Sequence, residues 1–258
     1  MTLLESYYNK FNEEHRLETR HGIVEYTVTQ KYIHQCIGSR KNLKILDVGA
    51  GTGRYSVALA QEGHTVTAVE LVEKNRKAIE AKHQKGVHIW PGNALDLSFL
   101  EPDCFDITLV FGPLYHLHTQ KERLTVFEQA KRVTKKGGFI LAAYVMNDYS
   151  IIEYCFKKAK IRDCLKNGTV TPDFKTLSSQ QELYSYLRIE DIDELKEKSG
   201  LERVKLIAAD GPADYMRREL NAMDEETFEL FVKYQLANAE RPELLGASSH
   251  TVDILKNL

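Results

Sequence analysis

The sequence has few of the features that mark secreted or membrane-bound proteins. Its 258 residues include only four cysteines, which lie far apart without a C-x-x-C pair, and this argues against a disulfide framework. No apolar run is long enough to span a membrane, and the first ten residues lack the apolar stretch of a signal peptide. We therefore expect a cytoplasmic protein with reduced thiols and no membrane partner.

An excess of positive charge is also missing. Lysine and arginine together number 35 against 37 acidic residues, which gives a formal net charge of −2. Proteins that bind nucleic acids usually carry a strongly basic face, because they must neutralise a phosphate backbone. A small-molecule substrate is therefore favoured over a nucleic acid, while the oligomeric state stays open.

Apolar runs and helical patterns alternate along most of the chain. Strands are predicted at 43–48, 65–69, 87–90, 106–111, 139–145, 201–208 and 249–255, and helices at 55–61, 73–85 and 121–135. Such alternation is typical of parallel strands joined by right-handed crossovers, with helices on both faces of the sheet. The pattern predicts an α/β fold, a Rossmann-like, doubly wound, mostly parallel sheet of seven strands.

The chain is long enough for one elaborated domain, and it shows no internal repeat. Regular alternation lapses after residue 145, where Gly and Pro turns separate short helical patterns. We predict a single domain over 1–258, with a core at about 41–145 and 200–258. Helical cap elements are expected at 1–40, 146–199 and 211–246.

The sharpest motif is a glycine-rich turn between the first predicted strand and the helix that follows it, ILDVGAGTGRY at 45–55. Glycine allows the tight turn and lets a ligand lie directly on the main chain, while the helix start offers free N–H groups. Glu70 ends the next strand, about twenty residues beyond the turn, where a carboxylate can bind the two hydroxyls of a ribose. Alone, the glycine turn or Glu70 is weak evidence for a ligand site. Together they predict a nucleoside-containing ligand.

At these residues the chain resembles the class I S-adenosylmethionine (SAM)-dependent methyltransferases, in particular their small-molecule branch that includes ubiquinone-biosynthesis-type enzymes. The resemblance covers about 44–144. It implies that the glycine turn wraps the methionine part of SAM and that the acidic residue binds its ribose. The cofactor-binding residues expected here are Asp47, Gly49, Ala50, Gly51, Gly53, Glu70 and Leu71.

Two downstream segments extend the resemblance. GNA at 92–94 is similar to the G-D-A segment that holds adenine, which implies adenine contacts for Asn93 and Ala94. An amide oxygen can accept the adenine amino group as a carboxylate does, although Asn93 could equally be a turn residue. RVTKKGG at 132–138 is similar to the family's R-V-L-K-P-G-G stretch but lacks its proline.

The segment FGPLYHL at 111–117 resembles the G-P-L-Y-H-L segment that these enzymes place between cofactor and acceptor. The resemblance implies SAM contacts for Phe111 and Gly112 and acceptor contacts for Tyr115 and His116. Only His116 could act as a general base near neutral pH, and a purely structural role is the alternative. No metal is expected, because His116 and His118 have no acidic or cysteine partner at ligand spacing.

Arginines before the first predicted strand could pair with the carboxylate of SAM, since related enzymes close this region over the cofactor; Arg20 is the candidate. In-line displacement at a sulfonium needs mainly a well-placed nucleophile, so a strong catalytic signature is not required.

Three alternatives stay open at this point: an NAD-dependent oxidoreductase, which the G-x-G-x-G spacing disfavours, a non-catalytic SAM-binding module, and a methyltransferase that acts on RNA or protein.

Overall fold

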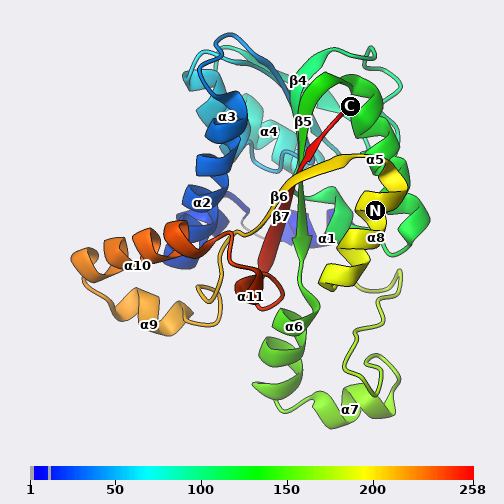
Figure 1. Ribbon diagram of the computed structural model, residues 1–258, viewed down its shortest axis with the longest axis vertical. Helices are drawn as coiled ribbons and strands as arrows, with labels where there is room; N and C mark the ends of the chain where they lie inside the picture. The colour runs from blue at the N-terminus through cyan, green and yellow to red at the C-terminus, as the bar shows by residue number, and fades with distance from the viewer. Residues whose placement is uncertain (1–2, 11–12) are drawn as a thin grey trace.

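Seven strands form one sheet in the computed structural model, which describes residues 3–10 and 13–258 (Figure 1). They are β1 (Lys44–Val48), β2 (Thr65–Glu70), β3 (Val87–Pro91), β4 (Phe105–Val110), β5 (Thr134–Val145), β6 (Glu202–Ala208) and β7 (His250–Lys256). The order across the sheet is β3-β2-β1-β4-β5-β7-β6, and only β7 runs antiparallel to its neighbours β5 and β6. The predicted α/β fold with a mostly parallel seven-stranded sheet is confirmed.

Helices cover both faces of this sheet. They are α1 (Leu3–Lys10), η1 (Glu13–Glu18), α2 (Arg20–Ile37), α3 (Arg54–Gln61), α4 (Glu73–Glu80), η2 (Pro113–His116), α5 (Gln120–Val133), α6 (Asn147–Ser150), η3 (Ile151–Phe156), α7 (Ile161–Lys166), α8 (Ile189–Ser199), α9 (Arg217–Ala222), α10 (Glu225–Asn238) and α11 (Pro242–Leu245). Neighbouring residues of a strand point to opposite faces, so Ile45 joins the core beneath α2 and α3 while Leu46 joins the core beneath α5 and α8.

Two predicted helices end earlier in the structure than the sequence indicated. The helix expected at 73–85 stops at Glu80, because His83 and Gly86 take left-handed backbone angles, with φ of 47° and 87°. The helix expected at 121–135 stops at Val133, because Thr134 is already extended and its hydroxyl bonds the Ala130 carbonyl oxygen at 2.7 Å. As a result β5 begins at Thr134, five residues before the predicted start.

Two helices that the sequence assigned to the cap belong to the layers on the sheet. In α2, Val28, Tyr32 and Ile33 are buried against the same core as β1, which corrects the cap boundary at residue 40. In α8, Ile192 and Leu195 are buried in the core that α5 covers, so the cap predicted over 146–199 is too long. Both helices have broad apolar faces, and packing on the sheet removes these faces from water.

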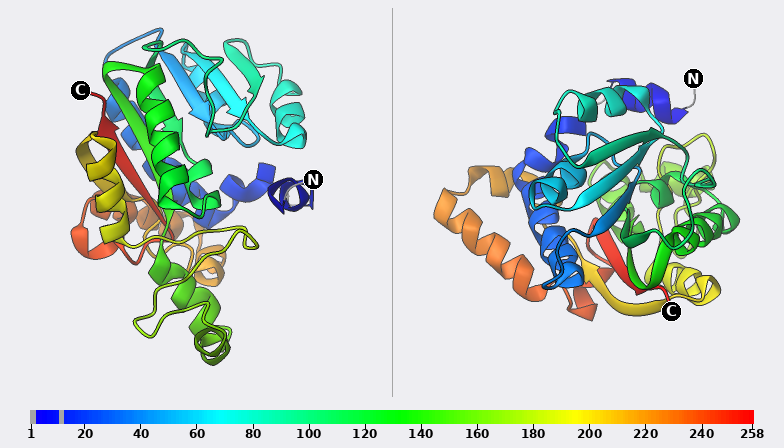
Figure 2. Two further views of the ribbon diagram at one scale, coloured as in Figure 1. Left: turned by 90° about the vertical axis from the view of Figure 1, so that its right-hand side faces the viewer. Right: turned by 90° about the horizontal axis from the view of Figure 1, so that it is seen from above.

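Two groups of helices remain beyond the carboxyl ends of the parallel strands. Figure 1 shows α6 and α7 below the end of β5, with α9 and α10 projecting to one side. The left view of Figure 2 places α1 below the ends of the first strands, near α4, and α1 contacts α4. Within the described part of the chain, no helix is both long and apolar enough to cross a membrane.

Candidate active site

The turn between β1 and α3 depends on glycine for its shape. Gly49 and Gly53 have φ of 73° and 80°, a region that a side chain disfavours. A Cβ on Gly49 would lie 2.7 Å from Pro113 Cδ, and one on Gly53 would lie 2.9 Å from Ile79 Cγ1. The Gly49 amide donates to the carbonyl oxygen of Val69 at 2.8 Å, which fixes the turn against the end of β2.

Glu70 connects this turn to the end of β2. Its two carboxylate oxygens accept the backbone N–H groups of Gly51 and Val72, both at 2.8 Å. Burial raises the pKa of Glu70, while these two hydrogen bonds oppose the shift. The Asn75 side-chain amide also donates to Oε1, at 3.4 Å, so the lone pair left for a ligand hydroxyl is on Oε2.

A cavity of about 200 Å³ opens at this edge of the sheet, which we call the cofactor cavity. Most of the predicted site residues line it: Asp47, Gly49, Ala50, Gly51, Glu70, Leu71, Asn93, Ala94, Phe111, Gly112, Tyr115 and His116. Gly53 does not line it; its left-handed backbone caps the start of α3, and a Cβ there would point at Ile79. The sheet topology brings the segments together, since β1, β2 and β4 end at one edge.

Two polar residues of the cavity wall also have internal partners. The Asp47 carboxylate accepts the Ser56 hydroxyl at 2.6 Å, and burial raises the pKa of Asp47 to about 6. The side-chain oxygen of Asn93 accepts the Leu95 amide at 3.0 Å, so Asn93 does form a local turn. The turn leaves a second lone pair on that oxygen for a ligand.

Tyr115 and His116 are both held in place by hydrogen bonds. The Tyr115 hydroxyl donates to the Phe111 carbonyl oxygen at 2.7 Å. His116 Nδ1 bonds the Leu183 carbonyl oxygen at 2.9 Å, so Nδ1 carries the proton and Nε2 accepts the Tyr8 hydroxyl at 3.0 Å. Burial lowers the pKa of His116 to about 4. His116 is therefore a neutral side chain with both nitrogens engaged, which favours the structural alternative.

Arg20 does not line the cofactor cavity, contrary to the sequence prediction that it pairs with the carboxylate of SAM. Its guanidinium donates to the carbonyl oxygens of Leu220 and Met223, at 2.8 and 2.6 Å, and pairs with Glu225. These bonds direct Arg20 toward the carboxyl end of α9, away from the cofactor cavity. Arg16 lines that cavity instead, and Glu25 holds it through a 2.7 Å ion pair. Arg16 is in η1 and Arg20 begins α2, four residues later, and the sequence carries no signal that selects between them.

The structure also assembles a polar cluster that the sequence did not suggest. Glu25, Asp210 and His250 come from α2, the segment after β6 and the start of β7, and their ligand atoms lie within 4.8 Å of one another. No motif links positions so far apart in the chain. The sequence signal closest to it, the Ser249-His250 pair, is ambiguous without the partners that folding brings.

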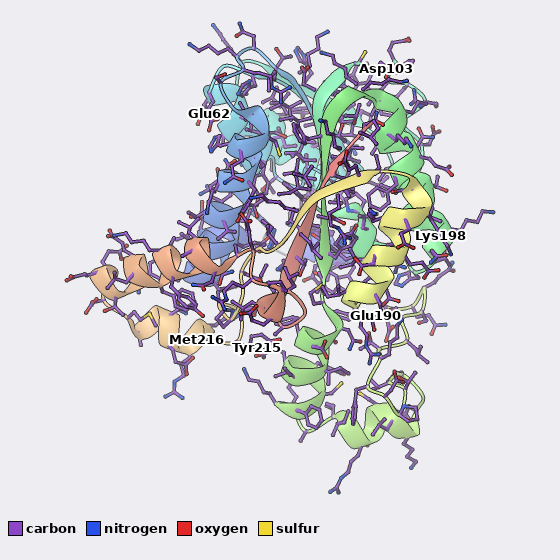
Figure 3. The ribbon with its side chains drawn as sticks, viewed as in Figure 1. Glu62, Asp103, Glu190, Lys198, Tyr215 and Met216 are labelled. Atoms are coloured by element: carbon purple, nitrogen blue, oxygen red, sulfur yellow. The ribbon has the colours of Figure 1, made fainter. Side chains whose placement is uncertain are left out.

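A second cavity, of about 770 Å³, lies among α6, η3 and the segments that follow α7 and β6; we call it the cap cavity. Tyrosines line much of it: Tyr149, Tyr154, Tyr184, Tyr186 and Tyr215. Figure 3 labels Tyr215 in the segment between β6 and α9, beyond the carboxyl ends of the parallel strands.

Comparisons with known proteins agree with this geometry. Residues 46–142 match a family model described as a methyltransferase domain. An uncharacterized methyltransferase of Bacillus licheniformis is 28% identical over 57% of this chain and 70% of its own length. A demethylmenaquinone methyltransferase of Staphylococcus aureus is 28% identical over 49% of this chain, and the match spans only 53% of that relative.

Solved structures share the fold at low sequence identity. A SAM-dependent methyltransferase from Methanosarcina mazei superposes with a TM-score of 0.58 at 16% identity, covering 88% of this chain and 97% of the other. A 1,6-didemethyltoxoflavin-N1-methyltransferase from Burkholderia thailandensis gives 0.55 at 17% identity, covering 90% and 77%. The residues that the family model matches, 46–142, run from β1 to β5 and contain the glycine turn, Glu70 and the β4 segment. Residues 46–142 therefore form a methyltransferase domain, and the chain shares its fold with SAM-dependent methyltransferases.

Proposed function

We propose that the protein transfers the methyl group of SAM to a small-molecule acceptor. The observation that carries the proposal is the cofactor cavity, in which a glycine turn, a buried carboxylate at the end of β2 and the β4 segment face one space. The relatives named above are methyltransferases, and one acts on demethylmenaquinone by its name. These facts favour an enzyme over a non-catalytic SAM-binding module.

The residues of the cavity fit SAM in their chemistry. The main chain at Gly49 and Gly51 can approach the methionine part, and Glu70 offers a carboxylate oxygen to the ribose hydroxyls. Asn93 and Ala94 line the end where the adenine would lie, and Phe111 with Gly112 closes the far wall. We assign the carboxylate of SAM to Arg16 rather than to Arg20.

Bound SAM supplies an activated methyl group on a sulfonium. The protein then has to exclude water and orient the acceptor lone pair toward that methyl carbon, in line with the bond to sulfur. Tyr115 and His116, packed in the wall, shape the side of the cavity from which an acceptor comes. Because His116 is neutral and engaged on both nitrogens, we propose a shaping role for it rather than a base.

We also propose a cytoplasmic location and an acceptor other than nucleic acid. The four cysteines are all free in the structure, as expected for a reducing compartment. The formal net charge of −2 gives no support to phosphate-backbone binding.

Calorimetric titration with SAM, with S-adenosylhomocysteine and NADH as comparators, tests the proposal. Binding of SAM and S-adenosylhomocysteine without NADH binding is the expected result, because the cavity ends in the Asn93 segment and the glycine spacing is G-x-G-x-G. NADH binding in place of SAM would overturn the proposed function. An acceptor screen with radiolabelled SAM then separates the enzyme from a non-catalytic module.

A further inference from the structure

Two of the four cysteines meet in the cap. The sulfur atoms of Cys155, in η3, and Cys164, in α7, lie 3.8 Å apart, and the Cys155 thiol donates a weak hydrogen bond to Cys164. A disulfide bond is about 2.05 Å long, so the two sulfur atoms are about 1.8 Å short of bonding distance. Cys36 and Cys104 pack in the two separate cores on the sheet. Folding therefore brings one particular pair of thiols together.

The backbone between η3 and α7 holds this pair in place. The Lys160 amide donates to the Cys155 carbonyl oxygen at 2.7 Å, and the Cys164 amide donates to the Lys160 carbonyl oxygen at 3.0 Å. Ala159 takes a left-handed backbone angle, with φ of 53°, where the chain turns between the two helices. Local hydrogen bonds thus fix the approach of the two sulfur atoms.

The helix that carries Cys164 is lightly packed. None of the six residues of α7, all of them described, is buried. Ile161 and Cys164 are only half-buried, against a small cluster of Ile151, Cys155 and Val170. Figure 1 shows α7 at the end of the molecule, below α6 and beyond the sheet. A helix with few buried apolar contacts shifts at a low cost in free energy, so the sulfur atoms can reach bonding distance.

Both thiols can be reached from the cap cavity. Cys155 and Cys164 line it, although Cys155 has only 1% of its surface exposed. Its volume of about 770 Å³ lies within the range of roughly 300 to 1,000 Å³ that small-molecule pockets cover. The wall of the cavity extends to the protein surface, because Tyr154 and Lys158 also line it and are exposed. A small reagent can therefore approach the two sulfur atoms from solvent.

The surroundings of the two thiols give them different parts in a reaction. Burial raises the pKa of Cys155 to about 11, and the hydrogen bond to Cys164 adds to the shift. Cys155 therefore keeps its proton near neutral pH, and the half-buried Cys164 is the thiol that reacts first. Modification of Cys164 removes that hydrogen bond, and Cys155 is then the thiol placed to attack the modified sulfur.

A metal centre fits the pair less well than a disulfide does. Structural zinc sites use four protein ligands, from cysteine, histidine or carboxylate side chains. Within residues 3–10 and 13–258, the only group of three or more such side chains close enough to hold a metal ion is Glu25, Asp210 and His250. The two sulfur atoms therefore have no third ligand in the described part of the chain.

We propose that Cys155 and Cys164 are a redox-active pair that forms an intrachain disulfide by exchange with a low-molecular-weight disulfide in the cap cavity. The Cys164 thiolate attacks one sulfur of the small disulfide, and the other sulfur leaves with the electron pair and takes up a proton. Cys155 then loses its proton and attacks Cys164 Sγ, which releases the second small thiol. The two cysteines lose two electrons in total, and the small disulfide gains them.

The new bond draws α7 toward η3 and so changes one wall of the cap cavity. Disulfides that form in reducing compartments are usually transient and serve catalysis or redox sensing. The pair therefore gives the cap a reduced and an oxidised form. This inference does not depend on the cofactor cavity or on methyl transfer.

The test incubates the reduced, folded protein with oxidised glutathione at neutral pH, blocks the remaining thiols by alkylation and digests the protein with trypsin without reduction. Lys157, Lys158 and Lys160 lie between the two cysteines, so trypsin leaves them on separate peptides that only a disulfide joins. Mass spectrometry of the wild type should find these two peptides linked. Excess reduced glutathione should separate them again and restore both thiols.

Variants of the cysteines test the order of the two steps. Cys155→Ser should accumulate a mixed disulfide with glutathione at Cys164, because the second attack is lost, and Cys164→Ser should leave Cys155 unmodified. Cys104→Ser is the matched control, since Cys104 is half-buried like Cys164 but packs in a core of the sheet, and it should form the linked peptides as the wild type does.

The wild-type result decides the inference even if a variant folds poorly, which circular dichroism melting detects. A stable mixed disulfide at Cys164 of the wild type would overturn it, because Cys155 would then fail to attack. An unmodified Cys164, or linked peptides that appear only when urea is added, would overturn it as well.

Discussion

Stability should fall as the pH rises through the range in which His250 loses its proton. The pKa of His250 rises from 6.5 to about 9 on folding, mainly because Glu25 and Asp210 face the imidazole. A group with a raised folded-state pKa stabilises the fold fully below its unfolded pKa, and this contribution is lost as the pH passes the folded pKa. Its window here is from about pH 6.5 to about pH 9.

The size of the effect follows from the shift. At about 1.4 kcal/mol for each pKa unit, a rise of about 2.5 units is worth roughly 3 kcal/mol of unfolding free energy below pH 6.5. The same relation leaves less than about 0.5 kcal/mol at pH 9. His250 has only 18% of its side chain exposed, so solvent screening reduces this figure little.

Urea unfolding of the wild type and of His250→Gln between pH 6 and pH 9 measures this contribution. The difference in unfolding free energy between the two proteins should shrink by about 2 to 3 kcal/mol across the window. Against the effect of burial, Arg16 lowers the pKa of Glu25, so Glu25 stays ionised across that window and its altered surroundings in the variant add only a constant offset. Parallel stability curves would refute the account of the buried imidazolium.

Three further predictions concern the cofactor cavity. Arg16→Ala should weaken SAM binding by roughly tenfold or more, as expected for a charge-assisted hydrogen bond, whereas Arg20→Ala should leave the affinity unchanged and lower the melting temperature; equal effects on affinity by calorimetry would contradict our assignment. Glu70→Ala leaves the Gly51 and Val72 amides without an acceptor, so SAM affinity should fall at least tenfold, with Glu70→Gln retaining part of it; unchanged titrations would remove the ribose site. Because the pKa of His116 is about 4, His116→Gln should leave the limbs of the pH–rate profile in place and cost much less than 10²-fold in kcat; a lost limb near neutral pH would restore His116 as a base.

Local sequence patterns predicted the frame of the site because its parts are short-range. The glycine turn needs left-handed backbone angles that only glycine adopts readily, and Gly49 and Gly53 have them. Glu70 follows from its place at the end of a strand. Boundaries were less well predicted, since Thr134 ends α5 through a hydroxyl bond and a pairing with β4 that the sequence does not reveal.

Residues that face one another from distant segments could not be predicted. Arg16 and Arg20 have the same chemistry and lie four residues apart, and only packing against α9 decides which one reaches the cavity. His116 looked like a base from its type and position, but burial and two hydrogen bonds keep it neutral. The protonation state of His116 is set by its surroundings in the fold and cannot be read from the sequence.

The sequence by itself determined the class of the fold, the turn that receives the cofactor and the segments that approach it, because hydrophobic period and glycine spacing act locally. Only the tertiary structure decided which polar groups from distant segments meet. Glu25 on α2 and His250 on β7 become neighbours because β7 enters antiparallel beside β5, with His250 opposite Val145. That neighbourhood, with Asp210, raises the pKa of His250 to about 9 and makes it a cation near neutral pH.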